Sequence, residues 1–322
     1  MTIKEFIDFG VEKLSPLYSH EESIALCNRV LVGLAGYKDY AYISDPDREI
    51  LLIDKESVEN KKDKNFSAAL MCEAVLRMAK GEPVQYVLGY ELFCGHRFNV
   101  GPGVLIPRPE TEAMVSLITL SNSSRKPHEI LDICTGSGCI AWSLWSNFPR
   151  SYVYGCDNSD VALEYARNQK VERRKPDASV VMPEHIDSVI DDAKTSQPAP
   201  DFFKCDILSP EAMSVFGARK FDIIACNPPY VLEKEKKFMR PNVLDYEPRE
   251  ALFVSDDNPL VFYRKISQLA FDMLNRNGRI YFEINEMFGE QVASLMGEMG
   301  FSEPQVVTDI NNRPRIVRAL RW

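Results

Sequence analysis

From residue 129 onward, short apolar runs alternate with stretches of helical spacing, and this pattern restricts the possible folds more than any other feature. The runs are continuous rather than alternating, so they predict strands that are buried on both faces. Such strands, separated by helices, form a mostly parallel sheet in an α/β domain. The expected strands cover 130–134, 152–156, 221–226 and 279–284. Two later runs, 305–310 and 315–320, predict a closing antiparallel pair.

The first 82 residues place their apolar side chains at helical intervals instead, which predicts a small helical bundle. Polar segments, notably 59–64, separate its helices. Such a bundle can serve as a partner-docking module or simply as a stabilising appendage. The three apolar series are Ile3, Phe6, Ile7, Val11 and Leu14; Ile24, Leu26, Val30, Leu31 and Leu34; and Ala69, Leu70, Ala74, Val75 and Met78.

A hairpin linker is expected between these two parts, with strands at 84–88 and 98–100 and turns at Gly95 and 101–103. It leads to Pro107 and Pro109, after which acidic residues at 110 and 112 suit the first turn of a helix. The expected domains are therefore a helical domain over 1–82, a linker over 83–107 and a catalytic domain over 108–322. The polar, proline-containing stretch 170–200 is expected to be irregular.

A glycine-containing loop, Cys134-Thr135-Gly136-Ser137-Gly138, follows the first expected strand of the sheet. Ligands of open α/β sheets bind at the carboxyl ends of the strands, and glycine lets the backbone approach them closely. The next strand ends at Asp157, whose carboxylate can accept hydrogen bonds from two ribose hydroxyls. Such loops also bind NAD or FAD, or merely turn. Two features favour S-adenosylmethionine: Ala141 replaces the third glycine of dinucleotide loops, and Asp132 precedes the loop, as is common in methyltransferases.

A third cofactor contact is expected from Asp206 and Ile207, which follow the short apolar run 202–205. A carboxylate there can accept a hydrogen bond from the adenine amino group, while the isoleucine packs on the ring. The competing interpretation is that Asp206 caps a helix, and the sequence leaves both open.

The tetrapeptide Asn227-Pro228-Pro229-Tyr230 follows another apolar strand and has the residue types that a planar nitrogen acceptor needs. Methyl transfer from a sulfonium is an in-line displacement, so the acceptor lone pair must face the methyl group. The Asn227 oxygen and the Pro228 carbonyl can accept hydrogen bonds from an NH2 group, and consecutive prolines hold that carbonyl rigidly. The Tyr230 ring can pack on the flat face of the acceptor. A proline-rich turn capped by asparagine is the purely structural alternative.

With these motifs, the chain resembles the HemK/PrmC family of peptide chain release factor N5-glutamine methyltransferases, in its bacterial form. Besides Asn227 to Tyr230, the resemblance rests on three stretches and covers nearly the whole chain. These are Glu82 to Gly89 followed by Leu105 to Glu112, then Tyr246 to Leu252, and finally Asp309 to Arg315.

The resemblance implies a class I methyltransferase fold, Rossmann-like, with a mostly parallel seven-stranded sheet. It implies transfer of a methyl group from S-adenosylmethionine to the glutamine amide nitrogen in the Gly-Gly-Gln loop of class 1 release factors, leaving S-adenosylhomocysteine. Cofactor contacts carry over to residues 134–138, Asp157, Ile207 and Asn227, and substrate contacts to residues 227–230. Two positions depart from the family, which often has glycine at Cys134 and tryptophan at Ile207.

Charge and composition exclude several other functions. The net charge of −9 argues against a nucleic-acid partner, which usually requires a basic face. No apolar run approaches the roughly 18 residues of a membrane span, and no secretory signal is visible, so a cytoplasmic protein is expected. The cysteines are dispersed and the four histidines form no ligand set, which predicts reduced thiols and no metal.

Two rival functions remain. The first is a nucleic-acid adenine N6-methyltransferase, because an exocyclic amine poses a similar geometric problem to a glutamine amide. The acidic charge and the Ile106-Pro107-Arg108-Pro109 segment argue against it. The second is a non-catalytic assembly factor with a vestigial pocket, which the intact glycines, Asp157 and Asn227 disfavour.

Overall fold

The computed structural model describes residues 1–50, 68–173 and 197–322. Two compact units make up the described chain: residues 1–90 with 239–246, and residues 91–238 with 247–322. Residues 83–90 of the expected linker fall in the first unit, and residues 91–107, with most of the hairpin, fall in the second. The polar segment 59–64 and most of the stretch 170–200 lie outside the described residues. None of the described helices is long and apolar enough to cross a membrane.

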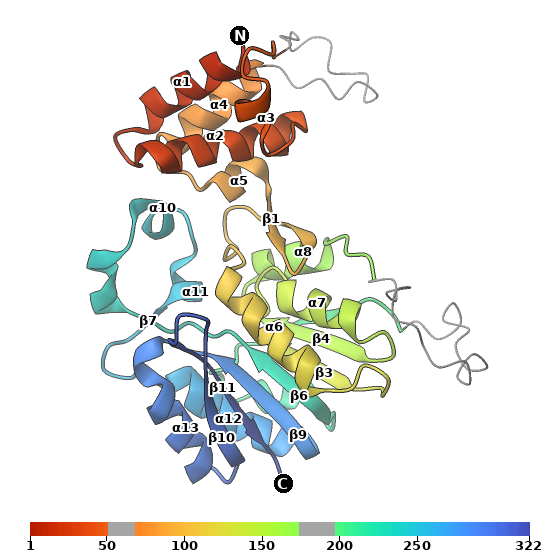
Figure 1. Cartoon of the computed structure of the whole chain (residues 1–322). Helices are drawn as coiled ribbons and strands as arrows, with labels where there is room; N and C mark the ends of the chain where they lie inside the picture. Colours follow the sequence, from red (N-terminus) through yellow and green to blue (C-terminus); the bar gives the residue numbers. More distant parts are fainter. Residues whose placement is uncertain (51–67, 174–196) are drawn as a thin grey trace, which may run out of the picture. The chain divides into compact units, whose positions relative to one another are not determined.

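The first unit is a bundle of helices around an apolar core (Figure 1). Its helix α1 begins with a capping box, in which Thr2 and Glu5 satisfy each other's backbone N–H groups. The three expected helices are confirmed as α1, α2 and α4. The helices are α1 Ile3–Leu14, α2 His20–Ala35, α3 Ala41–Ser44, α4 Ala68–Met78, α5 Val84–Leu88 and α10 Pro241–Leu244.

Residues 239–246, which contain α10, pack within this first unit although they follow the Asn-Pro-Pro-Tyr motif in sequence. The Tyr246 hydroxyl donates to the Lys80 carbonyl at 3.0 Å. Arg240 and Glu22 form an ion pair with an N–O distance of 2.5 Å. These contacts join residues more than 160 positions apart, so local sequence patterns could not predict them.

The expected strand at 84–88 is wrong: these residues form the single-turn helix α5. Pro83 precedes the helix with extended backbone, and Gly89 ends it in the left-handed conformation. Four of the five residues are buried, so their apolar character reflects burial on several sides rather than a strand. The hairpin consists instead of β1 Tyr90–Phe93 and β2 His96–Asn99. Its turn, Cys94-Gly95, has two positive φ angles, as a tight hairpin requires.

Seven described strands of the second unit form one sheet in the order β10-β11-β9-β6-β3-β4-β5. The sheet contains five strands that run parallel to one another, β9, β6, β3, β4 and β5. Strand β11 runs antiparallel to both β9 and β10. This confirms the expected α/β architecture and the closing antiparallel pair. The strands are β3 Glu129–Ile133, β4 Tyr152–Asp157, β5 Asp201–Lys204, β6 Phe221–Cys226, β9 Leu274–Glu283, β10 Ser302–Thr308 and β11 Pro314–Leu320.

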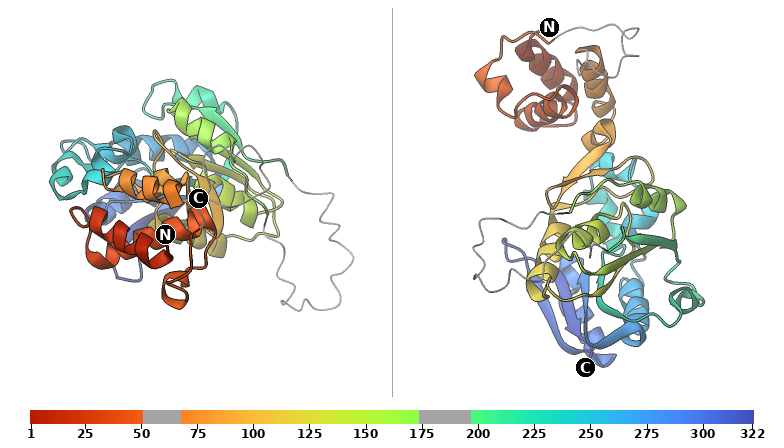
Figure 2. Two further views of the ribbon diagram at one scale, coloured as in Figure 1. Left: turned by 90° about the horizontal axis from the view of Figure 1, so that it is seen from above. Right: turned by 90° about the vertical axis from the view of Figure 1, so that its right-hand side faces the viewer.

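Helices cover both faces of this sheet (Figure 1, Figure 2). Successive strand residues belong to two separate hydrophobic cores. Ile130 and Ile223 join the core under α6, α7 and α8, whereas Leu131 and Ile224 join the one under α9, α12 and α13. Burial on both sides explains why the strands read as continuous apolar runs. The helices are α6 Pro109–Ser121, α7 Cys139–Asn147, α8 Asp160–Arg167, α9 Ala212–Phe216, α12 Val261–Met273 and α13 Gly289–Glu298.

Short elements complete the second unit around the Asn-Pro-Pro-Tyr motif. Strands β7 Val231–Leu232 and β8 Phe253–Val254 pair in parallel. Between them lie the 3₁₀-helix η3, Glu233–Phe238, and the helix α11, Arg249–Leu252. A second 3₁₀-helix, η4, covers Glu286–Phe288 directly after β9.

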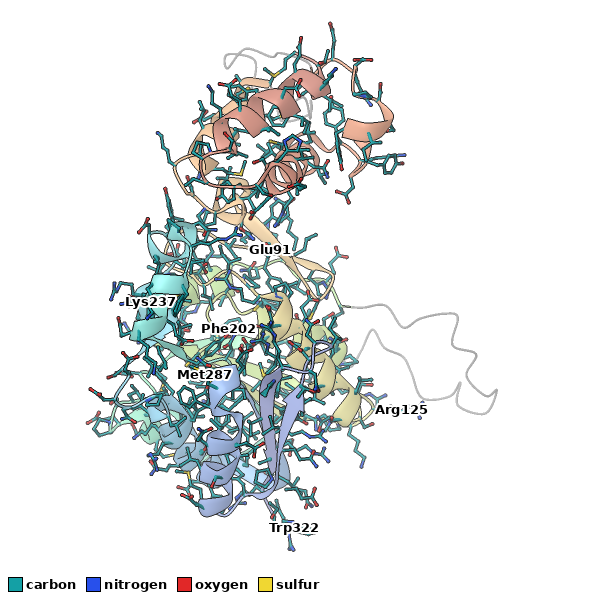
Figure 3. The ribbon with its side chains drawn as sticks, turned by 60° about the vertical axis from the view of Figure 1, so that its left-hand side comes forward. Glu91, Arg125, Phe202, Lys237, Met287 and Trp322 are labelled. Carbon is teal, nitrogen blue, oxygen red and sulfur yellow. The ribbon has the colours of Figure 1, made fainter. Side chains whose placement is uncertain are left out.

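Gly155 in β4 provides a test of this packing. A Cβ added there would lie 2.6 Å from ring carbons of Phe202, which is buried inside the second unit (Figure 3), and 2.8 Å from the Thr135 hydroxyl. Gly155→Ala should therefore lower the free energy of unfolding by about 1–3 kcal/mol. The matched control is Gly297→Ala in α13, where the added Cβ meets nothing closer than 3.7 Å. That change should leave stability equal or raise it by up to about 1 kcal/mol. Urea denaturation monitored by circular dichroism measures the free energy of unfolding of both variants. Equal effects of the two substitutions would contradict the close packing of Gly155 against Phe202.

Candidate active site

A cavity of about 220 Å³ opens at the carboxyl ends of β3, β4 and β6 in the second unit. Most of the residues expected from the sequence line it: Cys134, Thr135, Gly136, Ser137, Asp157, Asp206, Ile207, Asn227 and Pro229. Gly138, Pro228 and Tyr230 are not part of the lining. The structure thus brings cofactor-type and acceptor-type residues to one cavity.

The two glycines of the loop have different tasks. Gly136 has φ +55°, faces open space where a Cβ would stand, and lines the cavity. Gly138 has φ +79° and is the N-cap residue of α7, which begins at Cys139. A Cβ at Gly138 would lie 3.1 Å from side-chain atoms of Ala166, Phe202 and Trp142. Gly136 therefore exposes backbone to a ligand, whereas Gly138 lets the loop pack against its surroundings.

Cys134 begins this loop with φ +59°, in the left-handed region that favours glycine. A non-glycine residue there costs roughly 1–2 kcal/mol. The position at which this sequence departs from the family pattern is therefore also a position of backbone strain, and Cys134 lines the cavity.

Asp157 combines loop support with spare acceptor capacity. Its Oδ2 accepts from the Gly136 N–H at 2.9 Å, and its Oδ1 accepts from the Ser159 N–H at 3.0 Å. Burial raises the pKa of this carboxyl, and the backbone hydrogen bonds oppose the rise. A carboxylate has about four acceptor positions, so it can still accept from a diol.

Asp132 lies beneath the loop and is completely buried. Its Oδ2 accepts from the Thr135 hydroxyl at 2.6 Å and from the Ala141 N–H at 3.1 Å. Burial raises the pKa of Asp132 to about 7, although both hydrogen bonds favour the charged form. This carboxyl anchors the loop to the start of α7 and does not line the cavity.

Because the next described helix, α9, begins at Ala212 with Glu211 as its N-cap, the expectation that Asp206 caps a helix is wrong. The Asp206 Oδ1 accepts from the Leu208 N–H at 3.0 Å, which caps the local turn. Asp206 also lines the cavity beside Ile207, whose side chain is buried. Asp206 therefore both caps the local turn and forms part of the cavity lining.

The Asn-Pro-Pro-Tyr motif presents its first and third residues to the cavity. The Asn227 side-chain nitrogen donates to the Thr111 hydroxyl oxygen at 3.3 Å, which leaves the Asn227 oxygen as the group it can offer to a ligand. The Tyr230 hydroxyl instead donates to Glu283 Oε1 at 3.0 Å. Burial and the nearby Glu283 raise the pKa of Tyr230 well above its usual value. Tyr230 therefore has a supporting position in this structure.

Several candidate functional residues were not predicted from the sequence as site residues. Thr111 and Glu283 contact the motif, and Arg108 lines the cavity. Glu247, with a nearly completely buried side chain, pairs with Arg108 at 2.5 Å and accepts from the Ile106 N–H at 3.0 Å. One signal was present: a carboxylate, Glu283, directly follows the short apolar run 280–282 at the end of β9. The pairing of Glu247 with Arg108 spans 139 positions and has no local signal.

The Asp132 carboxyl gives stability a specific pH dependence. In the folded chain its pKa of about 7 lies above the unfolded value of roughly 4, so the native state binds more protons between these limits. As pH rises from 5 to 7, the free energy of unfolding of the wild type should therefore fall relative to that of Asp132→Asn. The expected decrease is up to about 1.4 kcal/mol per pH unit. Urea denaturation of both proteins at pH 5, 6 and 7 measures this difference. A stability difference between the two proteins that does not change with pH would contradict a raised pKa of Asp132 in the folded chain.

Comparison with known proteins places these features in a family. No family model matches the chain. A release factor glutamine methyltransferase from Bacteroides thetaiotaomicron is 39% identical over 276 residues, covering 85% of this chain and 89% of that protein. One from Flavobacterium psychrophilum is 34% identical over 324 residues and covers 99% of each chain. A third, from Thermodesulfovibrio yellowstonii, is 34% identical over 275 residues, covering 83% of this chain and 88% of that protein. The chain belongs to the release factor glutamine methyltransferase family.

Proposed function

We propose that this enzyme transfers the methyl group of S-adenosylmethionine to the side-chain amide nitrogen, N5, of the glutamine in the Gly-Gly-Gln motif of class 1 release factors. The observation that carries the proposal is the shared cavity: Asn227 and Pro229 line the same space as Gly136 and Asp157. Residues suited to a planar amide therefore stand beside residues suited to a nucleoside. The names of the relatives supply the substrate class.

The residues present fit an adenosyl group. Asp157 keeps acceptor positions for a ribose diol after its two backbone hydrogen bonds. Gly136 leaves open space in the wall, and the buried Ser137 also lines the cavity. Ile207 offers an apolar surface for the adenine ring, and Asp206 an acceptor for its amino group.

When bound, S-adenosylmethionine supplies an electrophilic methyl group on a sulfonium. The protein's own part is to orient the nucleophile. The Asn227 side-chain oxygen accepts from the glutamine NH2 group, and the Pro228 carbonyl is a second acceptor that Pro229 holds rigid. These bonds turn the amide lone pair toward the methyl group and weaken its delocalisation. The departing proton becomes acidic once the nitrogen is methylated, so water can take it and no general base is assigned.

The helical first unit is proposed to dock the release factor, which presents its glutamine on a protein loop. A protein substrate accords with the net charge of −9, because binding of naked nucleic acid usually relies on a basic face.

Co-expression with a class 1 release factor tests the activity directly. The Gly-Gly-Gln peptide should gain about 14 Da, the mass of a methyl group replacing a hydrogen, by in-line transfer to the amide nitrogen. Tandem mass spectrometry of the digested release factor locates the modification. Labelled S-adenosylmethionine offered with DNA or RNA is the control. Labelled nucleic acid together with an unmodified Gly-Gly-Gln peptide would favour an adenine N6-methyltransferase. The absence of any methyl transfer would favour a non-catalytic assembly factor.

Removal of the Asn227 amide should abolish most of the transfer. Asn227→Ala should lower kcat by at least about 100-fold, a typical effect of deleting one orienting hydrogen-bonding group. The matched control is Asn275→Ala in β9, where the amide donates to Asp222 outside the cavity lining. Steady-state rates and thermal unfolding of both variants are compared with the wild type. Full activity in a folded Asn227→Ala variant would remove Asn227 from the mechanism.

A further inference from the structure

Among the described residues that line the cavity of the second unit, Arg108 is the one that is basic. The other charged residues of the lining are the acidic Asp157, Asp206 and Glu250. Arg108 is the N-cap residue of α6, and 29% of its side chain is exposed. An arginine keeps its positive charge in proteins. An anionic group of a ligand therefore has a single partner of opposite charge in this lining.

A buried carboxylate holds Arg108 in place. The side chain of Glu247 is 1% exposed, and Glu247 does not line the cavity. Its Oε1 accepts from Arg108 Nη2 at 2.5 Å, and its Oε2 accepts from the Ile106 N–H at 3.0 Å. Both oxygens thus hold the same short segment, one through a side chain and the other through the backbone. Because the pairing already orders the arginine side chain, less conformational entropy is lost when a ligand binds to it.

The Arg108 guanidinium keeps donors that Glu247 does not use. An arginine has five N–H donors in a planar fork, and the hydrogen bond to Glu247 takes up one of them at Nη2. Within the parts of the chain that the structure describes, Arg108 makes no other side-chain hydrogen bond. Such a fork matches a carboxylate through two parallel N–H···O bonds. The remaining donors of Arg108 therefore suit a carboxylate of the ligand.

The strand order indicates which end of the cofactor reaches Arg108. Along the order β6-β3-β4-β5, Asn227 follows β6, Asp157 ends β4 and Ile207 lies after β5. The proposed adenine and ribose contacts thus lie toward β5, whereas the reacting methyl group must face Asn227 beside β6. Arg108 belongs to the β6 side, because Thr111 in the first turn of the same helix contacts Asn227. The amino-acid end of S-adenosylmethionine lies on the side of the sulfonium opposite to adenosine, and it carries a carboxylate.

We propose that Arg108, positioned by Glu247, binds the carboxylate at the amino-acid end of S-adenosylmethionine. The inference rests on the proposed use of this cofactor. The guanidinium donates hydrogen bonds to the two carboxylate oxygens, and no covalent bond forms or breaks in this step. Contacts at the carboxylate and at the ribose then hold the sulfonium between them, so that its methyl group is presented to the acceptor nitrogen.

Two forms of the cofactor that differ by one carboxylate test this assignment. S-adenosylmethionine and its decarboxylated form share the adenosyl group, the sulfonium and the ammonium. In calorimetric titrations without release factor, the wild type should bind the carboxylated form about 10- to 100-fold more tightly, as expected for a charge-assisted hydrogen-bonded pair. Arg108→Met should lose most of this preference. Its affinity for the decarboxylated form should stay within about twofold of the wild-type value, because the adenosyl contacts are independent of Arg108.

A second variant and a matched control separate lost binding from lost stability. Arg108→Met leaves Glu247 buried without its charged partner, which lowers stability. Arg108→Lys keeps a charge for Glu247 but replaces the fork by one ammonium group, so it should reduce the preference in a folded protein. The control is Arg315→Met. Arg315 donates to Asp309 at 3.1 Å, has 21% of its side chain exposed and lies outside the cavity lining, so its loss should leave the preference intact.

Glu247→Gln tests the positioning role. Glutamine keeps the size of the side chain but has one acceptor oxygen in place of two, so it cannot hold both Ile106 and Arg108 in the same way. The preference for the carboxylated cofactor should therefore decrease while Arg108 itself is retained. A folded Glu247→Gln variant with the full wild-type preference would remove Glu247 from the assignment.

The outcomes distinguish this inference from the proposed function. Equal affinity of the wild type for the two cofactor forms, or the full preference in Arg108→Met, would overturn the role of Arg108. A carboxylate of the release factor is the other source of the same chemistry. An unchanged cofactor preference in Arg108→Met with a raised KM for release factor would assign Arg108 to that protein instead. A wild type that shows the preference but does not methylate release factor would refute the proposed substrate and leave the role of Arg108 standing.

Discussion

The register of three parallel strands determines where the glycine loop, Asp157 and the Asn-Pro-Pro-Tyr motif lie relative to one another. Ile133 of β3 is the Cα partner of both Cys156 in β4 and Cys226 in β6. The residues that directly follow these three partners are Cys134, Asp157 and Asn227. Cys134 starts the glycine loop, Asp157 is the carboxylate proposed to bind a ribose, and Asn227 starts the acceptor motif. A shift of one residue in either pairing would turn the side chains of the shifted strand to the opposite face. Burial of both faces of the sheet makes such a shift costly, so the hydrophobic cores maintain the geometry of the cavity.

Buried carboxyls then fix the loops that leave this edge. Asp132 holds the glycine loop through Thr135 and Ala141, and Glu247 holds the Ile-Pro-Arg-Pro segment through Ile106 and Arg108. Glu283 contacts the acceptor motif. Each carboxyl loses hydration, but each gains donors that are directed by the backbone or by buried side chains. Because removal of one partner leaves a buried polar group unsatisfied, these loops resist rearrangement better than surface turns do.

The sequence predicted the sheet because continuous apolar runs and glycine-to-acid spacing are local patterns. The closing pair β10 and β11 was predicted in this way, and of the residues expected in the loop 134–138 and at Asp157 all but Gly138 line the cavity. The helix over Val84–Leu88 was missed because a buried single-turn helix and a buried strand have the same short apolar composition. Thr111, Glu283 and the pairing of Arg108 with Glu247 act across more than 50 positions, so only the folded chain reveals them.

The strained Cys134 illustrates how this surrounding order sustains an unfavourable local conformation. Glycine would adopt φ +59° without cost, yet the cysteine side chain packs against the core on the α12 face of the sheet and against Cys226. The neighbouring residues define the loop independently of Cys134. The Thr135 N–H donates to the Cys156 carbonyl at 3.0 Å, and the Gly138 N–H donates to the Thr135 carbonyl at 2.8 Å. Strain of about 1–2 kcal/mol persists where the surroundings over-determine the backbone, and here two strands and a buried carboxyl do so. The departure from glycine therefore changes the wall of the cavity without releasing the loop that forms it.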